Sequence, residues 1–424
     1  MSIFVEMIKL NHKSEQITGQ KQPNRMIIVE EAEARIAREL NPLSTEELPF
    51  GRATGRILRE PISADRDLPP YDRVMMDGVV LSSESWIAGH RSFQLGGLQL
   101  PGRPPLSLTD PEGCIKAMTG AVMPHGCDLV VPREEIEEEG EMIRINDDFD
   151  AKPGRYLHRR GSDCLVGDDL VLPGAELGPS EIAVAASCGR ELLTVTREIR
   201  VTVIDTGDEL VEVGEPVEPH QIRRSNAHAL TSACSRMPFV RAVSRHCPDD
   251  DELMREIIGE ALETSDLVLL SGGVSKGDRD NVPAILAEHG VEERFHWVRQ
   301  WPGKPLWFGI RPQGPLVFGL PGNPLAGRTC FHRYVVVALR GMAGATPLPE
   351  RKAALTESTS HRGQLTAFLP VTLRPLEGAV LGAEPRKPKN SGDFSAVVGS
   401  DGFVQLPAEQ ENFPAGHVAI FHPW

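Results

Sequence analysis

The sequence predicts a multidomain protein of the α/β plus β class, in which one three-layer α/β/α domain is joined to small β domains. The first observation is the rhythm of residues 198–346, where short apolar runs typical of buried strands alternate with helices. The second is that residues 82–150 and 347–424 contain short alternating strands separated by turns. The third is the length of 424 residues, which exceeds what one ordinary hydrophobic core holds.

Changes in this pattern divide the chain into segments. Residues 1–25 are polar after a short apolar start, and we expect a flexible N-terminal tail. The other segments are a linker and dimerisation domain that is discontinuous in sequence, an inserted β-barrel-like domain, an α/β domain and a C-terminal small β domain: 26–66 with 151–197, 67–150, 198–346 and 347–424. The linker domain is expected to begin with an amphipathic helix, because Val29, Ala32, Ile36 and Leu40 share one helical face.

Composition excludes several classes of protein. The net charge is −15 at pH 7, so we expect no nonspecific binding of nucleic acid through a basic surface. The seven cysteines include no CxxC pair, which argues against a structural zinc site or a disulfide framework and is typical of the reducing cytoplasm. No apolar run approaches the length of about 18 residues that a membrane helix needs, and the N-terminus lacks a signal-peptide cleavage pattern.

Polar and glycine-rich segments follow the expected strands of the α/β domain. The strands and the segments after them are 200–204 with Asp205-Thr206-Gly207-Asp208-Glu209, 239–245 with Asp249, 267–270 with Ser271-Gly272-Gly273, and 316–320 with Pro321-Gly322-Asn323. The carboxyl ends of parallel strands meet at one edge of a sheet, and ligands of open α/β sheets bind at that edge. The sequence therefore predicts a crevice there.

The segment from Ser265 to Asp280 is the most informative part of this edge. Glycines just past a buried strand, here Gly272 and Gly273, let several backbone N–H groups converge on an anionic group. Asp280 is expected to cap a helix with Pro283 in its first turn. Taken alone, the loop is equally well explained as an ordinary turn, because many α/β proteins turn a strand on two glycines without binding a ligand.

Two segments concentrate charge outside the α/β domain. Residues 67–81 combine Asp67, Asp72 and Asp77 with turn residues. They form either an ordinary acidic loop or a rigid lip that presents carboxylates to a cationic or metal-bound ligand. Four basic side chains also lie close together, and they either balance neighbouring acids or contact a phosphate or a second subunit: Arg155, His158, Arg159 and Arg160.

Together these motifs resemble those of the MoeA family of molybdopterin molybdenumtransferases, to which the E domain of gephyrin belongs. The resemblance covers nearly the whole chain from about Met26. Its motifs stand in family order: Leu68-Pro69-Pro70-Tyr71-Asp72 with Met76-Asp77-Gly78, Thr119-Gly120-Ala121, Arg159-Arg160-Gly161, Thr206 to Leu210, Ser271 to Ser275, Gly277 to Asp280, Pro302 to Pro305 and Gly319 to Pro324. One such motif is a weak signal, whereas the ordered set identifies the chain as a member.

The resemblance implies an elongated four-domain protein that forms an L-shaped homodimer, with an α/β domain similar to the MogA-type molybdopterin-binding fold. It also implies the insertion of molybdate into adenylylated molybdopterin with release of AMP, aided by Mg²⁺ or another divalent cation. The site would lie between the α/β domain of one subunit and the barrel of the other. Implied partners are a second copy of the chain, molybdopterin adenylyltransferase and molybdoenzymes, in the cytoplasm, with neither nucleic acid nor membrane.

The matching motifs carry the family's functional residues to positions of this chain. The implied catalytic residues are Asp72, Thr119, Glu209, Asp249, Asp280 and Lys304. The implied ligands of the divalent cation are Glu209, Asp249 and Asp280. The implied cofactor-binding residues are Thr206, Gly207, Ser271, Gly272, Gly273, Ser275, Pro321, Gly322, Asn323 and Ser391. Asp249 and Asp280 are expected to cap helices as well.

The chain departs from the family pattern ahead of Pro302. Trp297 and Trp301 stand where the family commonly has lysines, and an indole N–H cannot supply a cation to an oxyanion. In a continuous strand, Arg299 would point the same way as both tryptophans and partly replace the charge. Two other hypotheses therefore stay open: a non-catalytic molybdopterin carrier or scaffold that has lost the molybdate site, and a general nucleotide-pyrophosphate hydrolase.

Overall fold

The structure is a computed structural model that describes residues 26–274, 281–361 and 363–424. These residues fall into two compact units, one formed by the chain up to Thr45 together with Thr196–Trp424, the other by Glu46–Val195. Among the helices of the described residues, none combines the length and the apolar character that crossing a membrane requires.

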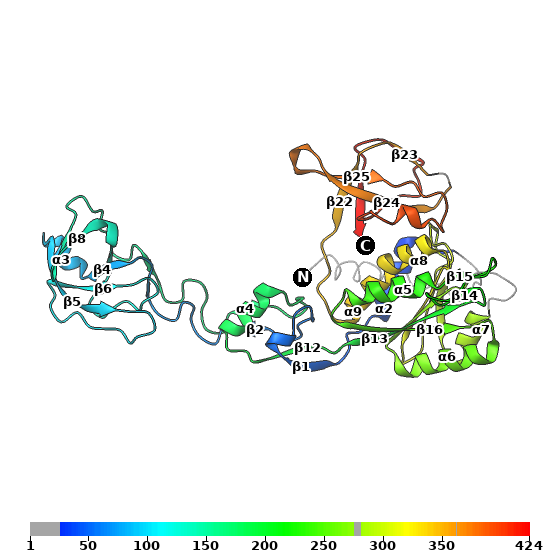
Figure 1. Ribbon diagram of the computed structural model, residues 1–424, viewed down its shortest axis with the longest axis horizontal. Helices are drawn as coiled ribbons and strands as arrows, with labels where there is room; N and C mark the ends of the chain where they lie inside the picture. The colour runs from blue at the N-terminus through cyan, green and yellow to red at the C-terminus, as the bar shows by residue number, and fades with distance from the viewer. Residues whose placement is uncertain (1–25, 275–280, 362) are drawn as a thin grey trace, which may run out of the picture. The chain divides into compact units, whose positions relative to one another are not determined.

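The unit that contains Thr196–Trp424 is built on a six-stranded sheet with helices on both faces (Figure 1). In spatial order its strands are β16 (Val240–Cys247), β13 (Ile199–Thr206), β17 (Leu267–Ser271), β21 (Leu316–Leu320), β20 (Trp307–Ile310) and β18 (Glu292–His296). Every residue of β17 and β21 is buried, as expected for strands covered on both faces. The four strands predicted from the sequence are all present and parallel.

The parallel arrangement of the sheet ends at one edge, where two further strands add antiparallel. β20 pairs antiparallel with both β21 and β18. The reason is the connection: only a short turn joins Ile310 to Leu316, and a parallel crossover would need a dozen or more residues.

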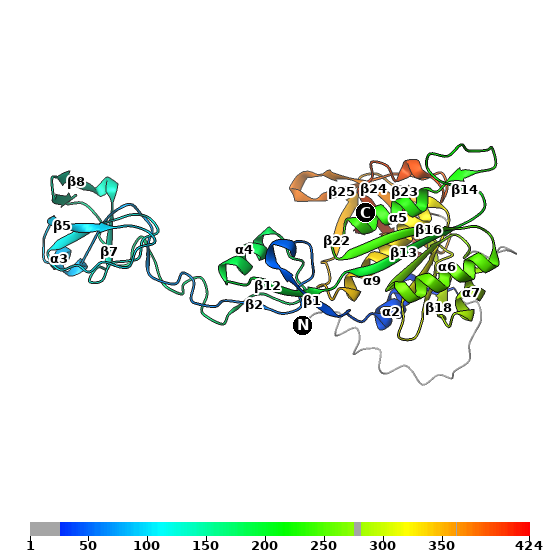
Figure 2. The ribbon, with the colours of Figure 1, turned by 60° about the horizontal axis from the view of Figure 1, so that its bottom comes forward.

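Helices cover the two faces of this sheet as separate layers (Figure 2). One face carries α6 (Asp251–Thr264) and α7 (Val282–Glu288), and the other carries α5 (Ser225–Ser235) and α8 (Pro324–Cys330). The apolar spacing of Met254, Ile258 and Ala261 puts one face of α6 into the core beneath β17. Among the described residues of this unit, the remaining α-helices are α2 (Val29–Glu39) and α9 (Val336–Met342), and a π-helical turn joins α8 to α9. The three-layer prediction is therefore confirmed.

The C-terminal region of the same unit closes into a five-stranded barrel. The strands follow one another as β24 (Thr366–Pro375), β25 (Leu381–Pro385), β22 (Arg351–Leu355), β28 (Val418–Pro423) and β26 (Gly402–Leu406), and β26 pairs again with β24. Closure leaves these strands without a free edge. A short strand, β19 (Gln300–Trp301), pairs with β24 and ties the barrel to the α/β layer, and β23 (Thr359–Ser360) pairs with β27 (Asn412–Phe413).

The unit Glu46–Val195 contains a second six-stranded sheet. Its strands follow the order β7 (Leu129–Pro132), β4 (Gly78–Leu81), β6 (Gly113–Ala117), β5 (Ser92–Gln99), β9 (Met142–Ile145) and β8 (Ile136–Glu139), and the short helix α3 is Ser83–Ile87. β8 and β9 form an antiparallel hairpin, which turns at Gly140 with φ of 68°.

Three short strand pairs join segments of the chain that are distant in sequence, and the second and third of them are antiparallel. They are β1 (Thr45–Pro49) with β12 (Leu192–Thr196), β2 (Ile62–Ser63) with β11 (Asp169–Val171), and β3 (Arg73–Val74) with β10 (Leu157–His158). Helix α4 (Pro179–Ser187) packs beside the first two around Leu58, Val195 and Ala185. The domain bounds given above stay a prediction.

Candidate functional site

The carboxyl ends of the parallel strands bring the predicted polar segments to one edge of the sheet. The strand registers place Thr206 beside Cys247, Asp205 beside Ser271, and Ser271 beside Leu320. The segments that follow these strands therefore lie next to one another, as the sequence predicted.

The two glycines after β17 adopt backbone conformations that other residues rarely take. Gly272 has φ of +100° and Gly273 has φ of +66°. A side chain at Gly273 would come 2.7 Å from Cγ2 of Val282 and 3.1 Å from Oγ1 of Thr206. The loop is therefore specific for glycine on both conformational and packing grounds. Two predicted site residues of the same loop, Ser275 and Asp280, lie outside the described residues.

Asn226 connects two of these segments and was not predicted as a site residue. Its Nδ2 donates hydrogen bonds to Oγ of Ser271 at 3.1 Å and to the carbonyl of Gly322 at 2.7 Å. Local sequence favours Ser225 or Asn226 as the cap of α5, but the residue at the N-cap is Arg224. Because both residue types are common caps, local sequence alone could not reveal the bridging role.

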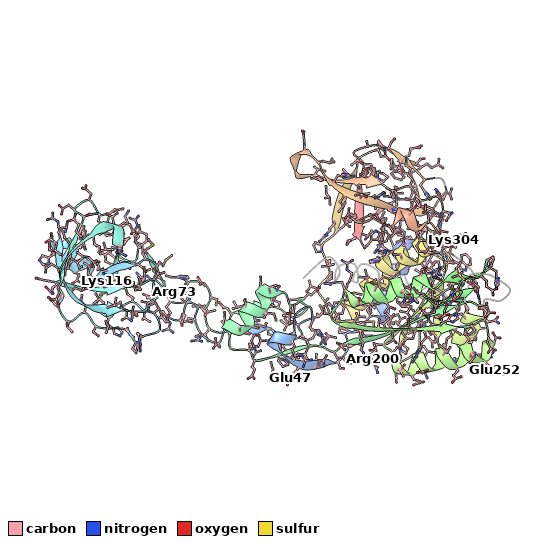
Figure 3. The ribbon with its side chains drawn as sticks, in the orientation of Figure 1. Glu47, Arg73, Lys116, Arg200, Glu252 and Lys304 are labelled. Atoms are coloured by element: carbon pink, nitrogen blue, oxygen red, sulfur yellow. The ribbon has the colours of Figure 1, made fainter. Side chains whose placement is uncertain are left out.

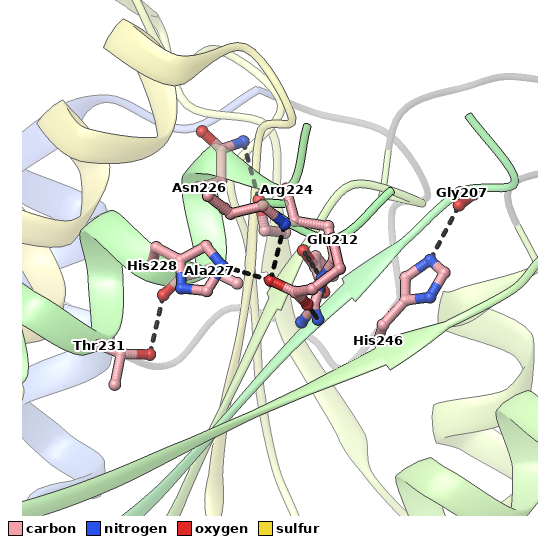
Figure 4. Close-up of polar contacts among 11 residues, drawn as sticks. Gly207, Glu212, Arg224, Asn226, Ala227, His228, Thr231 and His246 are labelled. Atoms are coloured by element: carbon pink, nitrogen blue, oxygen red, sulfur yellow. Dashed lines mark hydrogen bonds and ion pairs between the residues drawn. The ribbon is translucent and has the colours of Figure 1, made fainter. Parts of the chain in front are cut away.

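A buried ion pair holds the chain ahead of Asn226 (Figure 4). The Asp205 carboxylate is 2% exposed, and Arg224 donates to it from Nε at 3.0 Å and from Nη2 at 2.9 Å. The same guanidinium also donates to Glu212, which in turn contacts His228 Nε2 at 2.9 Å. Hydrogen bonds from the Val213 N–H, His228 and Arg224 lower the pKa of Glu212 to about 2.

This network ties together the segment between β13 and α5, which includes the short strands β14 (Leu210–Val211) and β15 (Ile222–Arg223). Because Asp205 stands at the end of β13 and Arg224 stands two residues before Asn226, the ion pair fixes where α5 begins. It thereby positions the Asn226 amide between the two loops.

The acids predicted to hold a divalent cation lie beside this segment. The Glu209 carboxyl group folds over Gly207, so that a Cβ at Gly207 would come 2.8 Å from its Cδ. The backbone N–H of Asp249 donates to Oδ1 of Asp208 at 3.0 Å. The prediction that Asp249 caps α6 is wrong, because Asp250 is the cap and accepts the N–H groups of Glu252 and Leu253.

Neither the Glu209 nor the Asp249 carboxylate forms an ion pair with another described residue. Within residues 26–274, 281–361 and 363–424, no group of three or more His, Cys, Asp and Glu side chains is arranged to hold a metal ion. The third predicted ligand is Asp280, outside those ranges. Two of the three acids are therefore available at the edge, and the set of three stays a prediction.

The loop after β21 meets the barrel region. Asn323 occupies the N-cap position of α8 and Pro324 is the first helical residue, a pairing typical of helix starts. The Asn323 side chain makes no capping bond and instead donates from Nδ2 to Oγ of Ser391 at 2.9 Å. The N–H of Ala326 also donates to the Ser391 carbonyl at 3.3 Å. Two predicted cofactor-binding residues from different domains, Asn323 and Ser391, are thus in direct contact.

The two tryptophans that replace the expected lysines, Trp297 and Trp301, contact different residues. Trp297 has φ of +78°, so residues 297–301 are not one strand and the predicted common direction of Arg299 with both indoles is wrong. The exposed Lys304, labelled in Figure 3, has its Nζ 5.7 Å from the Trp297 ring centroid. Trp301 stacks on His361 of the barrel region, with 5.6 Å between ring centroids. Arg299 donates to the carbonyl of Gln364.

The remaining predicted residues, Asp72 and Thr119, belong to the unit Glu46–Val195. Asp72 accepts hydrogen bonds from the backbone N–H of Arg160 at 2.8 Å and from Nη1 of Arg159 at 3.0 Å. The backbone N–H and the hydroxyl of Thr119 both donate to Oδ1 of Asp77 at 2.7 Å, which lowers the pKa of Asp77. The acidic lip is therefore a hydrogen-bonded structure and not a loose loop.

The basic cluster next to the lip is balanced by acids. Arg160 pairs with Asp67 at 2.8 Å, His158 contacts Asp163 at 2.7 Å, and Arg155 pairs with Asp150 at 3.4 Å. Of the two alternatives for this cluster, neutralisation of neighbouring carboxylates accounts for its contacts.

Comparison with known proteins agrees with this architecture along the whole described chain. Residues 27–189 match the MoeA N-terminal region (domain I and II), residues 202–341 a probable molybdopterin binding domain, and residues 352–424 the MoeA C-terminal region (domain IV). The chain is similar to a molybdopterin molybdenumtransferase of Synechocystis, with 38% identity over 87% of this chain and 93% of the relative. It is also similar to a molybdopterin molybdenumtransferase of Staphylococcus aureus, with 29% identity over 92% and 94%.

Solved structures give the same result. A crystal structure of a molybdopterin biosynthesis MoeA protein from Pyrococcus horikoshii covers 94% of this chain and 99% of its own, with 28% identity and a TM-score of 0.78. A second structure from the same organism covers 94% and 100% with a TM-score of 0.81, and at 24% identity it supports the fold alone. The chain belongs to the MoeA family of molybdopterin molybdenumtransferases.

Proposed function

We propose that the protein acts in molybdenum cofactor biosynthesis as a molybdopterin molybdenumtransferase, inserting molybdate into adenylylated molybdopterin with release of AMP. The observation that carries this proposal is the convergence of three loops at one sheet edge, with the Asn226 amide bonded to both Ser271 and Gly322. An edge of this kind supplies backbone N–H groups and hydroxyls, which are the donors that a phosphorylated pterin requires.

The pterin and its phosphates are proposed to lie along this edge. The proposed contacts are Thr206, Gly207, Ser271, Gly272, Gly273, Ser275, Pro321, Gly322, Asn323 and Ser391. Support comes from the glycine geometry after β17, which leaves the backbone open to close approach, and from the contact between Asn323 and Ser391. A ligand at this edge would therefore meet both the α/β layer and the barrel region.

A divalent cation, which we take to be Mg²⁺, is proposed to be held by Glu209, Asp249 and Asp280. When bound, such an ion neutralises charge on the oxygens of a diphosphate. The absence of ion pairs at Glu209 and Asp249 within the described residues fits this role, since neither carboxylate is already neutralised. Lys304 is proposed to attract the molybdate oxyanion, because its ammonium group is exposed.

The working form is proposed to be a homodimer in the cytoplasm, in which Asp72 and Thr119 of a second copy complete the site. Molybdopterin adenylyltransferase and molybdoenzymes are proposed as further partners. A non-catalytic carrier is not favoured, because the relatives that match over most of their length are transferases by name. In addition, Trp297 contacts Lys304 and Trp301 stacks on His361, so the two indoles do not stack on each other and fill the site together.

The test is AMP release by the purified protein supplied with adenylylated molybdopterin and Mg²⁺. Molybdate should trigger release, and Lys304→Ala should lower the rate by about tenfold or more, because removing one charged group from an oxyanion site costs about that much or more. Lys352→Ala is the matched control, since Lys352 is exposed and pairs with Glu350. The proposal fails if molybdate releases no AMP under conditions in which the Staphylococcus aureus relative is active.

A further inference from the structure

A groove between α5 and α8 carries positive charge that its own lining does not neutralise. The groove has a volume of about 170 Å³ and begins at Asn226 and Ser271, on the sheet edge described above. Arg236, Arg328 and His332 also line it, and its lining includes neither aspartate nor glutamate. In a chain of net charge −15, this concave surface with two arginines and no acid is a local excess of positive charge.

Neither arginine is neutralised by an acid among the described residues. Among the residues that the structure describes, neither the Arg236 nor the Arg328 side chain has an ion pair or a hydrogen bond. The Nε atom of Arg328 is buried and lacks a hydrogen-bond partner within the same residues. A buried donor without a partner is costly, so an acceptor bound at this position would be stabilising.

Arg328 is also held in place. Its guanidinium carbon lies 5.1 Å from the ring centroid of Trp424, and the same indole meets the His332 ring edge-on at 5.4 Å. Burial, together with the charges of Arg328 and Arg236, lowers the pKa of His332 to about 3, so this imidazole is neutral at pH 7. The positive charge of the groove therefore comes from the two guanidinium groups.

The apolar walls of the groove favour binding of an organic phosphate over binding of a free inorganic anion. Apolar side chains of Leu230, Ala233 and Phe331 line it beside the arginines. A small inorganic anion would leave these walls without contacts, whereas a phosphate ester could place its organic part against them. Arginine recognises phosphate through paired N–H donors, which matches the free donors of this site.

We propose that the α5–α8 groove binds the phosphate of a phosphomonoester between Arg236 and Arg328, with the organic part of the molecule extending toward Ser271 and Asn226. The groove opens onto the edge where the pterin nucleotide is proposed to bind. The identity of the carrier molecule, though not the phosphate site itself, rests on the proposed function. AMP is the simplest phosphomonoester that the proposed reaction supplies.

The experiment is isothermal titration calorimetry of the full chain with AMP, with inorganic phosphate and molybdate as separate titrants. AMP should bind, and Arg328→Gln and Arg236→Gln should each weaken binding by about ten- to hundredfold, the value of one charge-assisted hydrogen-bond pair. Arg241→Gln is the matched control, because Arg241 is exposed near the start of β16, away from the carboxyl edge. Arg236 is exposed, so its variant tests the site even if Arg328→Gln impairs folding.

Equal AMP affinity in the wild-type protein and in Arg236→Gln would overturn the proposal, as would binding of phosphate or molybdate without binding of AMP. The proposal is independent of turnover in this assay. Loss of AMP affinity in the arginine variants, in a protein that releases no AMP from adenylylated molybdopterin, would support the groove and refute the transferase function. Unchanged affinity in an active enzyme would do the reverse.

Discussion

At the scale of single residues, the Asp205–Arg224 pair determines how the candidate site is held. The carboxylate is 2% exposed and the guanidinium 10% exposed, so these charges are stabilised by neighbouring protein groups and hardly by water. An ion pair of this kind is weak evidence for net stability, but removing one partner leaves an uncompensated buried charge. The pair is therefore a sensitive point of the α/β domain.

Arg224→Gln is expected to destabilise the fold strongly. It leaves the Asp205 carboxylate buried without its counter-ion, which costs about 3–5 kcal/mol, and the melting temperature measured by scanning calorimetry should fall by several degrees. Arg223→Gln is the control, since Arg223 is an exposed neighbour whose side chain, among the described residues, donates to the carbonyl of Glu215 alone. The double variant Asp205→Asn with Arg224→Gln should recover part of the loss, and no recovery would contradict the charge argument.

Gly273 allows a second test at the scale of single residues. Comparison with Gly290 distinguishes the cost of backbone strain from the cost of a steric clash. Gly273→Ala should lower the melting temperature more than Gly290→Ala. Both glycines have positive φ, +66° and +77°, but an added Cβ at Gly273 meets Val282 at 2.7 Å whereas none of the surroundings lies within 4 Å at Gly290. Gly290→Ala should cost only the conformational strain of about 1–2 kcal/mol. Equal losses of melting temperature would show that packing against Val282 does not matter.

At the scale of elements, Asp266 joins the beginnings of two parallel strands. Its carboxylate accepts hydrogen bonds from both Nη atoms of Arg197 at 2.7 and 2.8 Å and from the backbone N–H of Arg200 at 2.8 Å. Burial alone would raise the pKa of Asp266, but the hydrogen bonds from Arg197 and Arg200 outweigh it and hold the pKa well below its ordinary value of 3.8. The ionised form is thus the one that the fold selects.

The stability of the sheet should therefore depend on pH through this carboxylate. A depressed pKa contributes stability that is complete above the unfolded value of about 4 and is lost as the pH falls from there toward the lower folded value. Asp266→Asn should have a lower melting temperature at pH 7 and a smaller further loss between about pH 5 and pH 3. Asp147→Asn serves as control, because Asp147 is 66% exposed. If the melting temperatures of the wild-type protein and Asp266→Asn fell equally between pH 5 and pH 3, the Asp266 carboxylate would not be the source of the pH dependence.

The elements also show what the sequence could and could not reveal. Buried apolar runs such as Leu267–Ser271 are local patterns, and this strand appears where predicted. The antiparallel strands β18 and β20 were missed because their pairing depends on a turn between Ile310 and Leu316 and on distant partners. The break at Trp297 was missed because a positive φ at a tryptophan is set by tertiary contacts.

The candidate site could likewise be predicted in part from the sequence. Motifs that end strands, such as Thr206-Gly207 and Ser271–Gly273, meet because parallel strands impose a common edge. Asn226, Arg236 and Arg328 could not be found in this way, because their roles come from two helices that are adjacent only in space. Residues whose function depends on packing between separate elements leave no local pattern in the sequence.

At the scale of the whole molecule, the predicted site residues are distributed over both compact units. Asp72 and Thr119 belong to Glu46–Val195, whereas Glu209 and Lys304 belong to the unit with the α/β layer. The proposed homodimer completes each site with one unit from each copy. Light scattering coupled to gel filtration should therefore give a mass of twice the 46.4 kDa of the chain.

A shared site has a sharper consequence than mass alone. Asp72→Asn and Glu209→Gln should each abolish molybdate-dependent AMP release, because each removes a carboxylate proposed to act in the reaction. If the site is built from two copies, a mixed dimer of the two variants contains one site with both carboxylates intact and one site with neither. Unfolding and refolding an equal mixture should therefore recover about a quarter of the wild-type activity, the statistical expectation for a two-fold symmetric dimer.

The controls are each variant refolded alone, the wild-type protein and a second mixture of variants. Each variant refolded alone must stay inactive, and wild-type protein carried through the same procedure sets the scale. A pair of variants in one unit, Glu209→Gln with Asp249→Asn, should show no recovery on mixing, since both carboxylates would come from the same copy in every site. Recovery for Asp72→Asn with Glu209→Gln but not for this second pair would place the reaction between two chains, and inactivity of both mixtures despite dimers in solution would confine the site to one.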